Sequence, residues 1–115
     1  MPKLLSQANF SNITVTSLTT TSDSQAVLDV FSKESYRSAR WQIQVVRGSS
    51  YNSGLIKVIH DGTNTYMTEY GNINQPNVGI ATFSTDVNSG DLRLLAYPDA
   101  ATATTFKFIY SAIKS

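Results

Sequence analysis

The clearest alternation of apolar and polar positions lies in residues 40–45. Its apolar members are Trp41, Ile43 and Val45, and the residues between them are Arg40, Gln42 and Gln44. A period of two is typical of a strand with one buried face. The pattern therefore predicts a half-buried strand whose core face carries Trp41, and it favours a structural role for this tryptophan over a binding role.

A hairpin is predicted a little further along the chain. Residues 55–60 form a strand-like run with Ile56, Val58 and His60 on one face, and Asp61-Gly62 follows at once. Asp-Gly between two strand-like runs favours a tight turn, because both residue types tolerate positive φ. Residues 65–70 are then expected to fold back antiparallel.

The other strand-like runs are short and separated by turn residues. They are residues 26–31, 79–83, 92–97 and 104–110, with weaker alternation in residues 12–20. Residues 48–54 are expected to form a polar connection bounded by glycines, and residues 32–38 a polar bridge with room for one helical turn. A second turn is predicted at residues 88–91.

Seven or eight short strands, with turn residues about every 8–12 residues, indicate an all-β protein. The expected fold is an antiparallel β-sandwich, immunoglobulin-like or jelly-roll-like, with an N-terminal arm. We divide the chain into an arm or strand with its linker over residues 1–25 and a β-sandwich domain over residues 26–115. A length of 115 residues suits one such compact domain.

The arm carries large apolar side chains that it cannot bury by itself. They are Leu4, Leu5, Phe10, Ile13 and Val15. These residues are candidates for contact with a partner, through addition of a strand to a neighbour's sheet edge or through a groove on a partner. The alternation over residues 12–20 is equally consistent with a strand that completes the chain's own sandwich.

Composition excludes several classes of partner and cofactor. Nine Lys and Arg against eight Asp and Glu give a net charge of +1, and the basic residues are scattered, so no nucleic-acid partner is expected. The chain has no Cys and one His, so no thiolate-bound metal and no other cofactor is expected. No run of residues predicts a signal peptide or a membrane span, so we expect synthesis in the cytoplasm and no membrane partner.

Candidate chemistry is sparse. His60 beside Asp61 suggests a base and its orienting carboxylate, but neighbours on a strand point to opposite faces, so a structural role is predicted. Loop oxygens suited to calcium occur without a defined spacing, at Asp86, Asn88, Asp91 and Asp99. A sugar-stacking platform is the other alternative, with Tyr51, Tyr66, Tyr70 and Tyr97 as its exposed aromatics. No catalytic residue is predicted, and we expect no enzyme.

Several short motifs occur in an order that resembles a small β-sandwich domain of tailed-phage virion proteins, common in phages of cyanobacteria. They are Ser35-Tyr36-Arg37-Ser38-Ala39-Arg40-Trp41, Gly48-Ser49-Ser50-Tyr51, Val58-Ile59-His60-Asp61-Gly62-Thr63, Thr68-Glu69-Tyr70 and Ala103-Thr104-Thr105-Phe106-Lys107. The resemblance covers residues 26–113. The chain departs from the family pattern at Arg40 and Trp41, where Lys and a smaller aromatic are usual.

The resemblance implies a non-enzymatic structural protein of the virion, made in the host cytoplasm. Its first interpretation is a capsid decoration or cement protein bound to the outer shell, with the major capsid protein as partner. The alternatives are a tail, neck or fibre component bound to other tail proteins, and a carbohydrate-binding adhesion module. The low charge fits a protein held by many repeated, moderate contacts on a symmetric shell. The sequence leaves open whether the chain also forms a homo-oligomer.

Overall fold

The computed structural model describes residues 15–76 and 78–115, and these residues form eight strands without a helix. In chain order the strands are β1 (Thr16–Thr20), β2 (Ala26–Ser32), β3 (Tyr36–Arg47), β4 (Ser50–His60), β5 (Thr65–Gln75), β6 (Ala81–Asn88), β7 (Asp91–Pro98) and β8 (Thr104–Lys114). The chain is therefore all-β over the described residues, as the alternation predicts.

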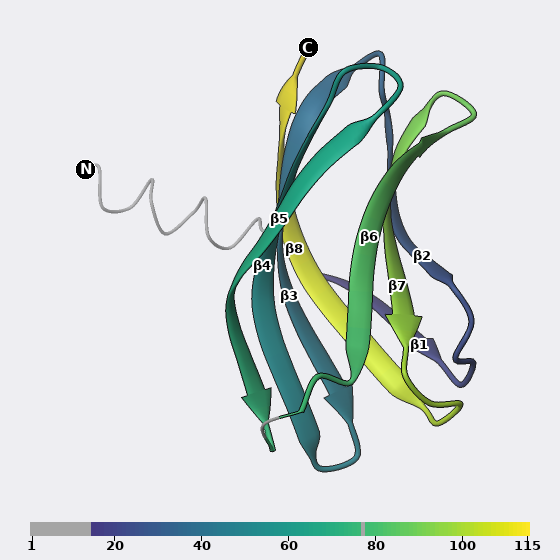
Figure 1. Ribbon diagram of the computed structural model, residues 1–115, viewed down its shortest axis with the longest axis vertical. Helices are drawn as coiled ribbons and strands as arrows, with labels where there is room; N and C mark the ends of the chain where they lie inside the picture. The colour runs from purple at the N-terminus through teal and green to yellow at the C-terminus, as the bar shows by residue number, and fades with distance from the viewer. Residues whose placement is uncertain (1–14, 77) are drawn as a thin grey trace.

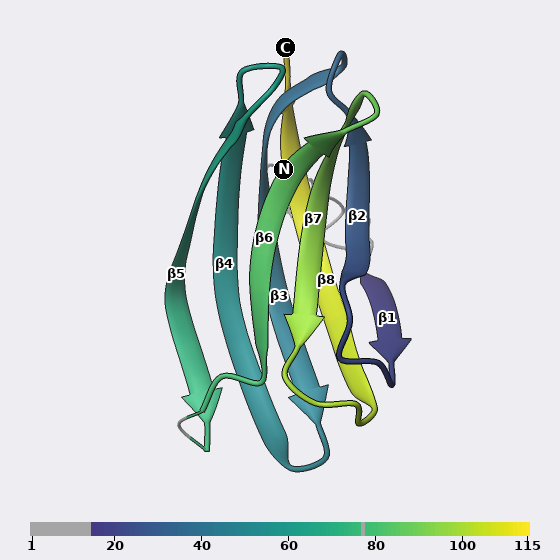
Figure 2. The same cartoon turned by 45° about the vertical axis from the view of Figure 1, so that its right-hand side comes forward.

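The strands form two antiparallel sheets that pack face to face as a sandwich (Figures 1 and 2). The larger sheet has the order β1-β8-β3-β4-β5, and the smaller one has the order β2-β7-β6. Five strands facing three leave part of the larger sheet without a covering strand. The uncovered part lies toward β5, which is one edge of the larger sheet.

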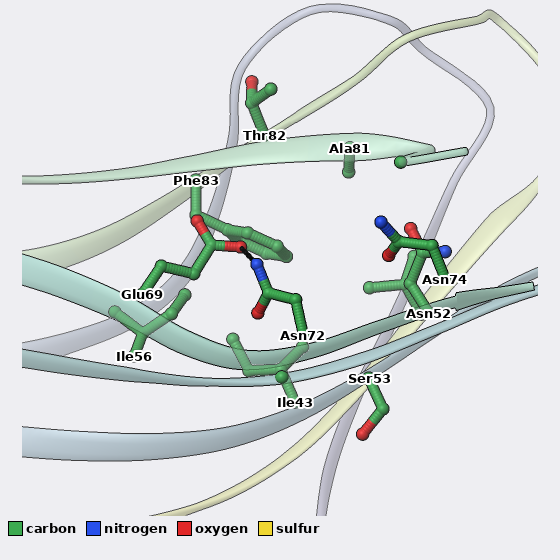
Figure 3. Close-up of a pocket in the computed structure, with 13 residues that line it drawn as sticks. Ile43, Asn52, Ser53, Ile56, Glu69, Asn72, Asn74, Ala81, Thr82 and Phe83 are labelled. Carbon is green, nitrogen blue, oxygen red and sulfur yellow. Dashed lines mark hydrogen bonds between the residues drawn. The ribbon is translucent and has the colours of Figure 1, made fainter. Parts of the chain in front are cut away.

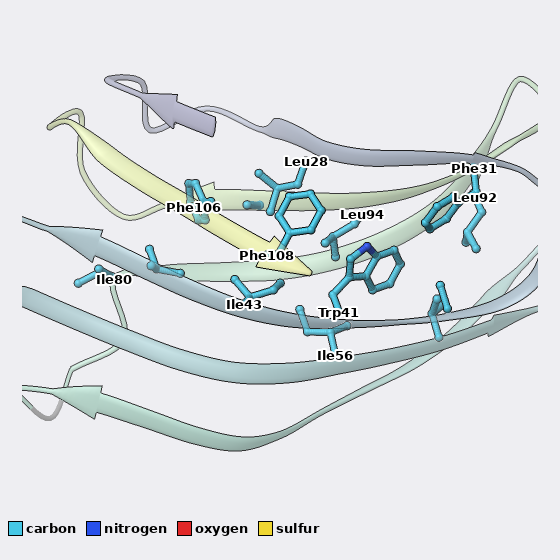
Figure 4. Packing of buried hydrophobic residues seen from close by; sticks show 14 residues of the cluster. Leu28, Phe31, Trp41, Ile43, Ile56, Ile80, Leu92, Leu94, Phe106 and Phe108 are labelled. Atoms are coloured by element: carbon cyan, nitrogen blue, oxygen red, sulfur yellow. The ribbon is translucent and has the colours of Figure 1, made fainter. Parts of the chain in front are cut away.

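The core lies between the sheets and is built from the alternating positions of both (Figure 4). Trp41, Phe106 and Phe108 from the larger sheet meet Leu92 and Leu94 from the smaller one, and all five side chains are buried. Phe31 stacks on Trp41 with ring centroids 6.0 Å apart. The predicted burial of Trp41 is confirmed, since none of its surface is exposed.

The predicted turns form, with geometries that depend on their glycines. Ser89 and Gly90 both have positive φ between paired Asn88 and Asp91, as a two-residue hairpin turn requires. The loop after β4 is longer, because it runs from residue 61 to residue 64 and only Gly62 has positive φ. Its turn is fixed by Asp61, whose side chain accepts hydrogen bonds from the backbone N–H groups of residues 63 and 64.

Two predicted connections differ from the structure. Residues 48–54 are mostly strand, since β4 begins at Ser50 and pairs with β3 from its first residue. Polar residues are compatible with this strand because its outer face is not covered by the second sheet. Residues 33–35 form a hydrogen-bonded turn instead of a helical turn, in which the N–H of Ser35 donates to the carbonyl of Ser32.

Strand β1 belongs to the chain's own sandwich. It pairs antiparallel with β8, and Leu18 lies opposite Phe106 on the core side. Of the two interpretations for residues 12–20, the structure shows the internal strand over residues 16–20.

Candidate functional site

The four tyrosines expected to form one platform do not lie together. Tyr51, Tyr66 and Tyr70 belong to β4 and β5, and their partners in the register place them on the face of the larger sheet that points away from the core. Tyr97 belongs to β7 in the other sheet, where its hydroxyl hydrogen-bonds the side-chain oxygen of Gln25. Three of the four tyrosines thus share a surface with exposed aliphatic residues, which we call the outer face.

The indole of Trp41 is tied to a carboxylate inside the sandwich. Its Nε1–H donates to Oδ2 of Asp29 over 2.9 Å, and Asp29 also accepts from the N–H of Val30. Burial raises the pKa of Asp29, while these two hydrogen bonds act in the opposite direction. A half-buried carboxylate bonded to a buried indole and to the N–H of the next residue has a structural role.

His60 is fixed by hydrogen bonds on both ring nitrogens. Nδ1 accepts from the N–H of Gly62 over 3.0 Å, so Nε2 carries the proton and donates to the carbonyl of Tyr36 over 2.7 Å. The side chain is 3% exposed. With both nitrogens used and the ring buried, His60 closes the β4–β5 loop against β3, which agrees with the structural role predicted for it.

Two of the residues considered for calcium, Asp86 and Asp99, form ion pairs with arginines. Asn88 and Asp91 lie opposite each other beside the β6–β7 turn. Asp86 of β6 receives two hydrogen bonds from the guanidinium of Arg93, which lower its pKa. Asp99 pairs with Arg47, which also binds Thr104 and the carbonyl of Ile80. Within residues 15–76 and 78–115, no group of three or more His, Cys, Asp or Glu side chains is placed to hold a metal ion.

A groove opens between the sheets where their edge strands diverge, β5 of the larger sheet and β6 of the smaller one (Figure 3). At one end the edges are held together by two hydrogen bonds. The Thr65 hydroxyl donates to the carbonyl of Thr85 and accepts from the Thr85 hydroxyl. Beyond this tie the groove encloses about 210 Å³. Its floor is apolar, with Ile43, Ile56 and Phe83, and its rim carries the polar residues Asn52, Glu69, Asn72 and Asn74.

A β-bulge places Asn72 in this groove. The register between β4 and β5 shifts between Ser53 and Leu55, so Gly71 and Asn72 together lie opposite Gly54. Gly71 has a φ of 67°, a value that favours glycine at the first position of such a bulge. A Cβ on Gly54 would lie 2.3 Å from Oδ1 of Asn72, so the side chain of Asn72 occupies space that only glycine leaves free.

The groove presents one carboxylate and several amides to solvent. Nδ2 of Asn72 donates to Oε2 of Glu69 over 3.1 Å (Figure 3). Asn52 has a structural task, because its side chain binds the carbonyl of Val78 and the N–H of Ile80. The carboxylate of Glu69 and the amides of Asn72 and Asn74 lie beside apolar side chains, an arrangement that suits binding of a polar ligand.

The arm residues proposed for partner contact fall mostly outside the structure's described part. Leu4, Leu5, Phe10 and Ile13 lie outside the described residues. Val15 is described and 58% exposed, and it borders a shallow depression on the outer face with Gln42, Gln44 and Lys107. The described residues also contain no helix long and apolar enough to cross a membrane.

Sequence reasoning missed the groove, although a signal for it exists. Gly71-Asn72 within a strand-like run is typical of a bulge, and Gly54 in the preceding strand marks a close approach. The pairing of the two glycine positions depends on the register, which a single sequence does not give. The predicted strand ends at residue 70, so the sequence places neither Asn72 nor Asn74 relative to Glu69.

Comparison with known proteins finds a structural likeness only. No family model and no curated protein matches the chain by sequence. The solved structure of the tailspike protein of Acinetobacter phage vB_ApiP_P1 matches 88% of this chain with a TM-score of 0.59 and 13% identity, over 22% of that protein. The tailspike protein of Acinetobacter baumannii phage AM24 matches 94% of the chain with a TM-score of 0.43 and 7% identity, over 27% of that protein.

The chain thus spans about a quarter of the length of these tailspike proteins. At 13% identity, the first match shows that the two proteins share a fold over most of the present chain. The resemblance to phage virion domains drawn from short motifs is consistent with this likeness. The cyanobacterial-phage affinity that the motifs suggested is not among these matches.

Proposed function

We propose that this chain is a non-enzymatic structural domain of a phage tail that acts by binding other virion proteins. The observation that supports the proposal is the shared fold with part of a phage tailspike protein, which extends over 88% of the chain. The geometry agrees with it, because His60, Asp29, Asp86 and Asp99 all serve the fold. The outer face carries exposed tyrosine and aliphatic side chains, which are available for contact with another protein.

The location in the virion distinguishes the tail role from capsid decoration, the role first expected from the sequence. A solved structure that shares this fold belongs to a phage tailspike protein, so we favour the tail. In this proposal the protein is made in the host cytoplasm and enters the particle with its tail. Residues 26–115 with β1 form the sandwich. The segment before β1 is the proposed partner-contact arm, with Leu4, Leu5, Phe10, Ile13 and Val15.

Copy number per particle tests the proposal. Purified particles and tails separated from them are digested, and the chain is quantified by mass spectrometry against isotope-labelled peptides, with the major capsid protein as internal reference. A tail component is expected in a few to some dozens of copies and enriched in the tail fraction. A ratio to the capsid protein near unity, with depletion from tails, would establish the decoration role and overturn the tail proposal.

A second candidate function is carbohydrate binding, and the groove of Glu69, Asn72 and Asn74 over Phe83 favours it. Amides and a carboxylate above an apolar floor match the hydroxyl groups and the apolar ring face of a sugar. The test is a glycan array probed with the natural chain and with Asn72→Ala, with Thr21→Ala in the exposed loop between β1 and β2 as the control. Binding lost only in Asn72→Ala is expected. An array without a positive glycan removes this candidate.

A further inference from the structure

Two cations of the outer face lie directly opposite each other. In the antiparallel register Arg40 of β3 pairs with Lys57 of β4, and both side chains are exposed. Like charges at directly opposite positions destabilise an antiparallel pair. The ion pairs of the described residues join Arg47 with Asp99 and Arg93 with Asp86, so neither cation of the outer face takes part in one.

The residues beside this pair carry hydroxyl groups, and none of them is a carboxylate. Ser111 of β8 lies opposite Arg40 and Thr68 of β5 lies opposite Lys57, so hydroxyl, guanidinium, ammonium and hydroxyl groups form one row across four strands. Lys107, opposite Gln44, is a third cation of the same face. We call the four residues Ser111, Arg40, Lys57 and Thr68 the cationic row.

No position of the outer face in the described registers carries Asp or Glu. The face comprises, strand by strand, Ser17 and Thr19; Thr105, Lys107, Ile109, Ser111 and Ile113; Ser38, Arg40, Gln42, Gln44 and Val46; Tyr51, Ser53, Leu55, Lys57 and Ile59; and Tyr66, Thr68, Tyr70, Ile73 and Gln75. Asp61 lies at its end, where it accepts from the Tyr66 hydroxyl and two backbone N–H groups of its own loop. The charge of the face is therefore positive.

Exposed apolar side chains flank the cationic row on both sides. On one side are Ile59, Tyr66 and Ile113, which are 49%, 56% and 69% exposed, and on the other are Tyr70 and Ile73, which are 39% and 67% exposed. Exposed apolar side chains gathered on one face and bordered by polar residues mark interaction sites, and interfaces between proteins are enriched in aromatic residues and arginine. The mixture of isoleucine and tyrosine around a cationic centre thus favours a protein partner.

We propose that the outer face is a docking surface for an acidic protein, whose carboxylates lie along the cationic row between Arg40 and Lys57. Charge complementarity carries the proposal, because a carboxylate placed there converts the repulsion between the two cations into two attractions. A second copy of this chain docked face to face would bring cation against cation, which disfavours that occupant. The inference rests on the proposed structural role, for which it names the kind of partner.

The test uses a soluble copolymer of glutamate and tyrosine as the acidic polypeptide probe and hyaluronate as the acidic polysaccharide probe. Binding of the full chain to each immobilised polymer is measured at low salt. Lys57→Glu removes one cation and gives Arg40 an opposite charge as cross-strand partner. Lys114→Glu, which makes the same charge change at the end of β8, is the matched control.

The natural chain is expected to bind the polypeptide, and Lys57→Glu to weaken this binding by about tenfold or more, while Lys114→Glu changes it by about twofold at most. Amide shifts on titration are expected to cluster at Arg40, Lys57, Thr68 and Ser111. Thermal unfolding checks that Lys57→Glu is folded, and its midpoint should equal or exceed that of the natural chain, since a repulsive pair becomes attractive.

Three results would overturn the proposal: no binding of the polypeptide at low salt, equal or tighter binding of hyaluronate, or the same loss in Lys57→Glu and Lys114→Glu. The second result would assign the face to an acidic glycan. These outcomes are independent of the particle measurements above. If the chain is found in tails but fails to bind the polypeptide, the structural role stands and the docking surface is rejected. If the chain is absent from particles, the structural role itself is rejected.

Discussion

Asp29 and Trp41 illustrate how one hydrogen bond specifies the arrangement of two sheets. The indole belongs to β3 of the larger sheet and the carboxylate to β2 of the smaller one, and the 2.9 Å bond between them crosses the core. Because the N–H group of the buried indole has this carboxylate as its partner, its loss leaves a donor without an acceptor. The pair therefore contributes to stability and also to the alignment of the sheets.

Asp29→Ala is expected to destabilise the protein by about 1–3 kcal/mol, the usual cost of a buried donor left without a partner. Asp29→Asn keeps an oxygen that the indole can donate to, so it is the matched control with the smaller effect. Urea unfolding followed by tryptophan fluorescence measures both. Equal destabilisation by the two variants would contradict this role of the hydrogen bond.

Asp61 gives the protein a predicted sensitivity to acid. Hydrogen bonds from the N–H groups of Asn64 and Thr63, with a further one from the Tyr66 hydroxyl, lower the pKa of Asp61 from 3.8 to about 2. A carboxyl whose pKa is lower in the folded state stabilises that state above its unfolded pKa, and the contribution is lost as the pH falls from about 4 toward 2. Asp86, lowered by Arg93, acts in the same direction.

Asp61→Asn is therefore expected to flatten the decline of stability below about pH 4, because the variant has no proton to take up at this position. The measurement is urea unfolding of both proteins at a series of pH values between neutrality and acid. Asp23→Asn, in the exposed loop between β1 and β2, is the control and should keep the slope of the natural chain. An unchanged slope in Asp61→Asn would show that another group causes the acid sensitivity.

At the scale of elements, the bulge in β5 decides the shape of the groove. Gly71 at positive φ turns Asn72 inward, and Gly54 on the neighbouring strand leaves room for it. Gly54→Ala is expected to displace the Asn72 side chain and break its bond to Glu69, because the added Cβ would meet Oδ1 at 2.3 Å. The displaced Oδ1 lies at the end of the Asn72 side chain, which can rotate away, so Gly54→Ala is expected to lower the free energy of unfolding only slightly.

A double-mutant cycle measures this coupling. The double variant with Gly54→Ala and Asn72→Ala should be more stable than the sum of the two single effects predicts, by about 0.5 kcal/mol or more. The reason is that Asn72→Ala removes the side chain that the new Cβ at position 54 would displace. Gly79→Ala is the control, because its Cβ would have no atom within 4 Å and its φ is not in the positive range. Additive effects of the two substitutions would show that Asn72 does not lie over Gly54.

The elements also show how much of this structure the sequence predicts. Alternation places Trp41, Ile43 and Val45 correctly in the core, since period two depends on neighbours in the chain alone. Residues 50–54 were expected in a connection, because their polar and glycine residues match a turn until the pairing with β3 is known. The groove and the Arg40–Lys57 pair depend on register between strands, which is a property of the fold and not of local patterning.

At the scale of the whole molecule, the two sheets differ in size, and the surface follows from that difference. Three strands cover only part of five, which leaves the groove beside β5 on the inner side. The opposite side of the larger sheet is one broad face across β1, β8, β3, β4 and β5 (Figure 1). Such a surface is suited to contact with another protein, because its apolar and cationic side chains lie on regular sheet positions and need little ordering on binding.

Location in the particle is the measurement that tests the central proposal most directly. Purified particles are labelled with gold-conjugated antibodies raised against this chain and imaged by electron microscopy, with antibodies against the major capsid protein as reference. The account predicts gold at the tail, with none over the shell beyond background. Gold distributed over the capsid surface, or particles without label while the antibody recognises the denatured chain in infected cells, would contradict it.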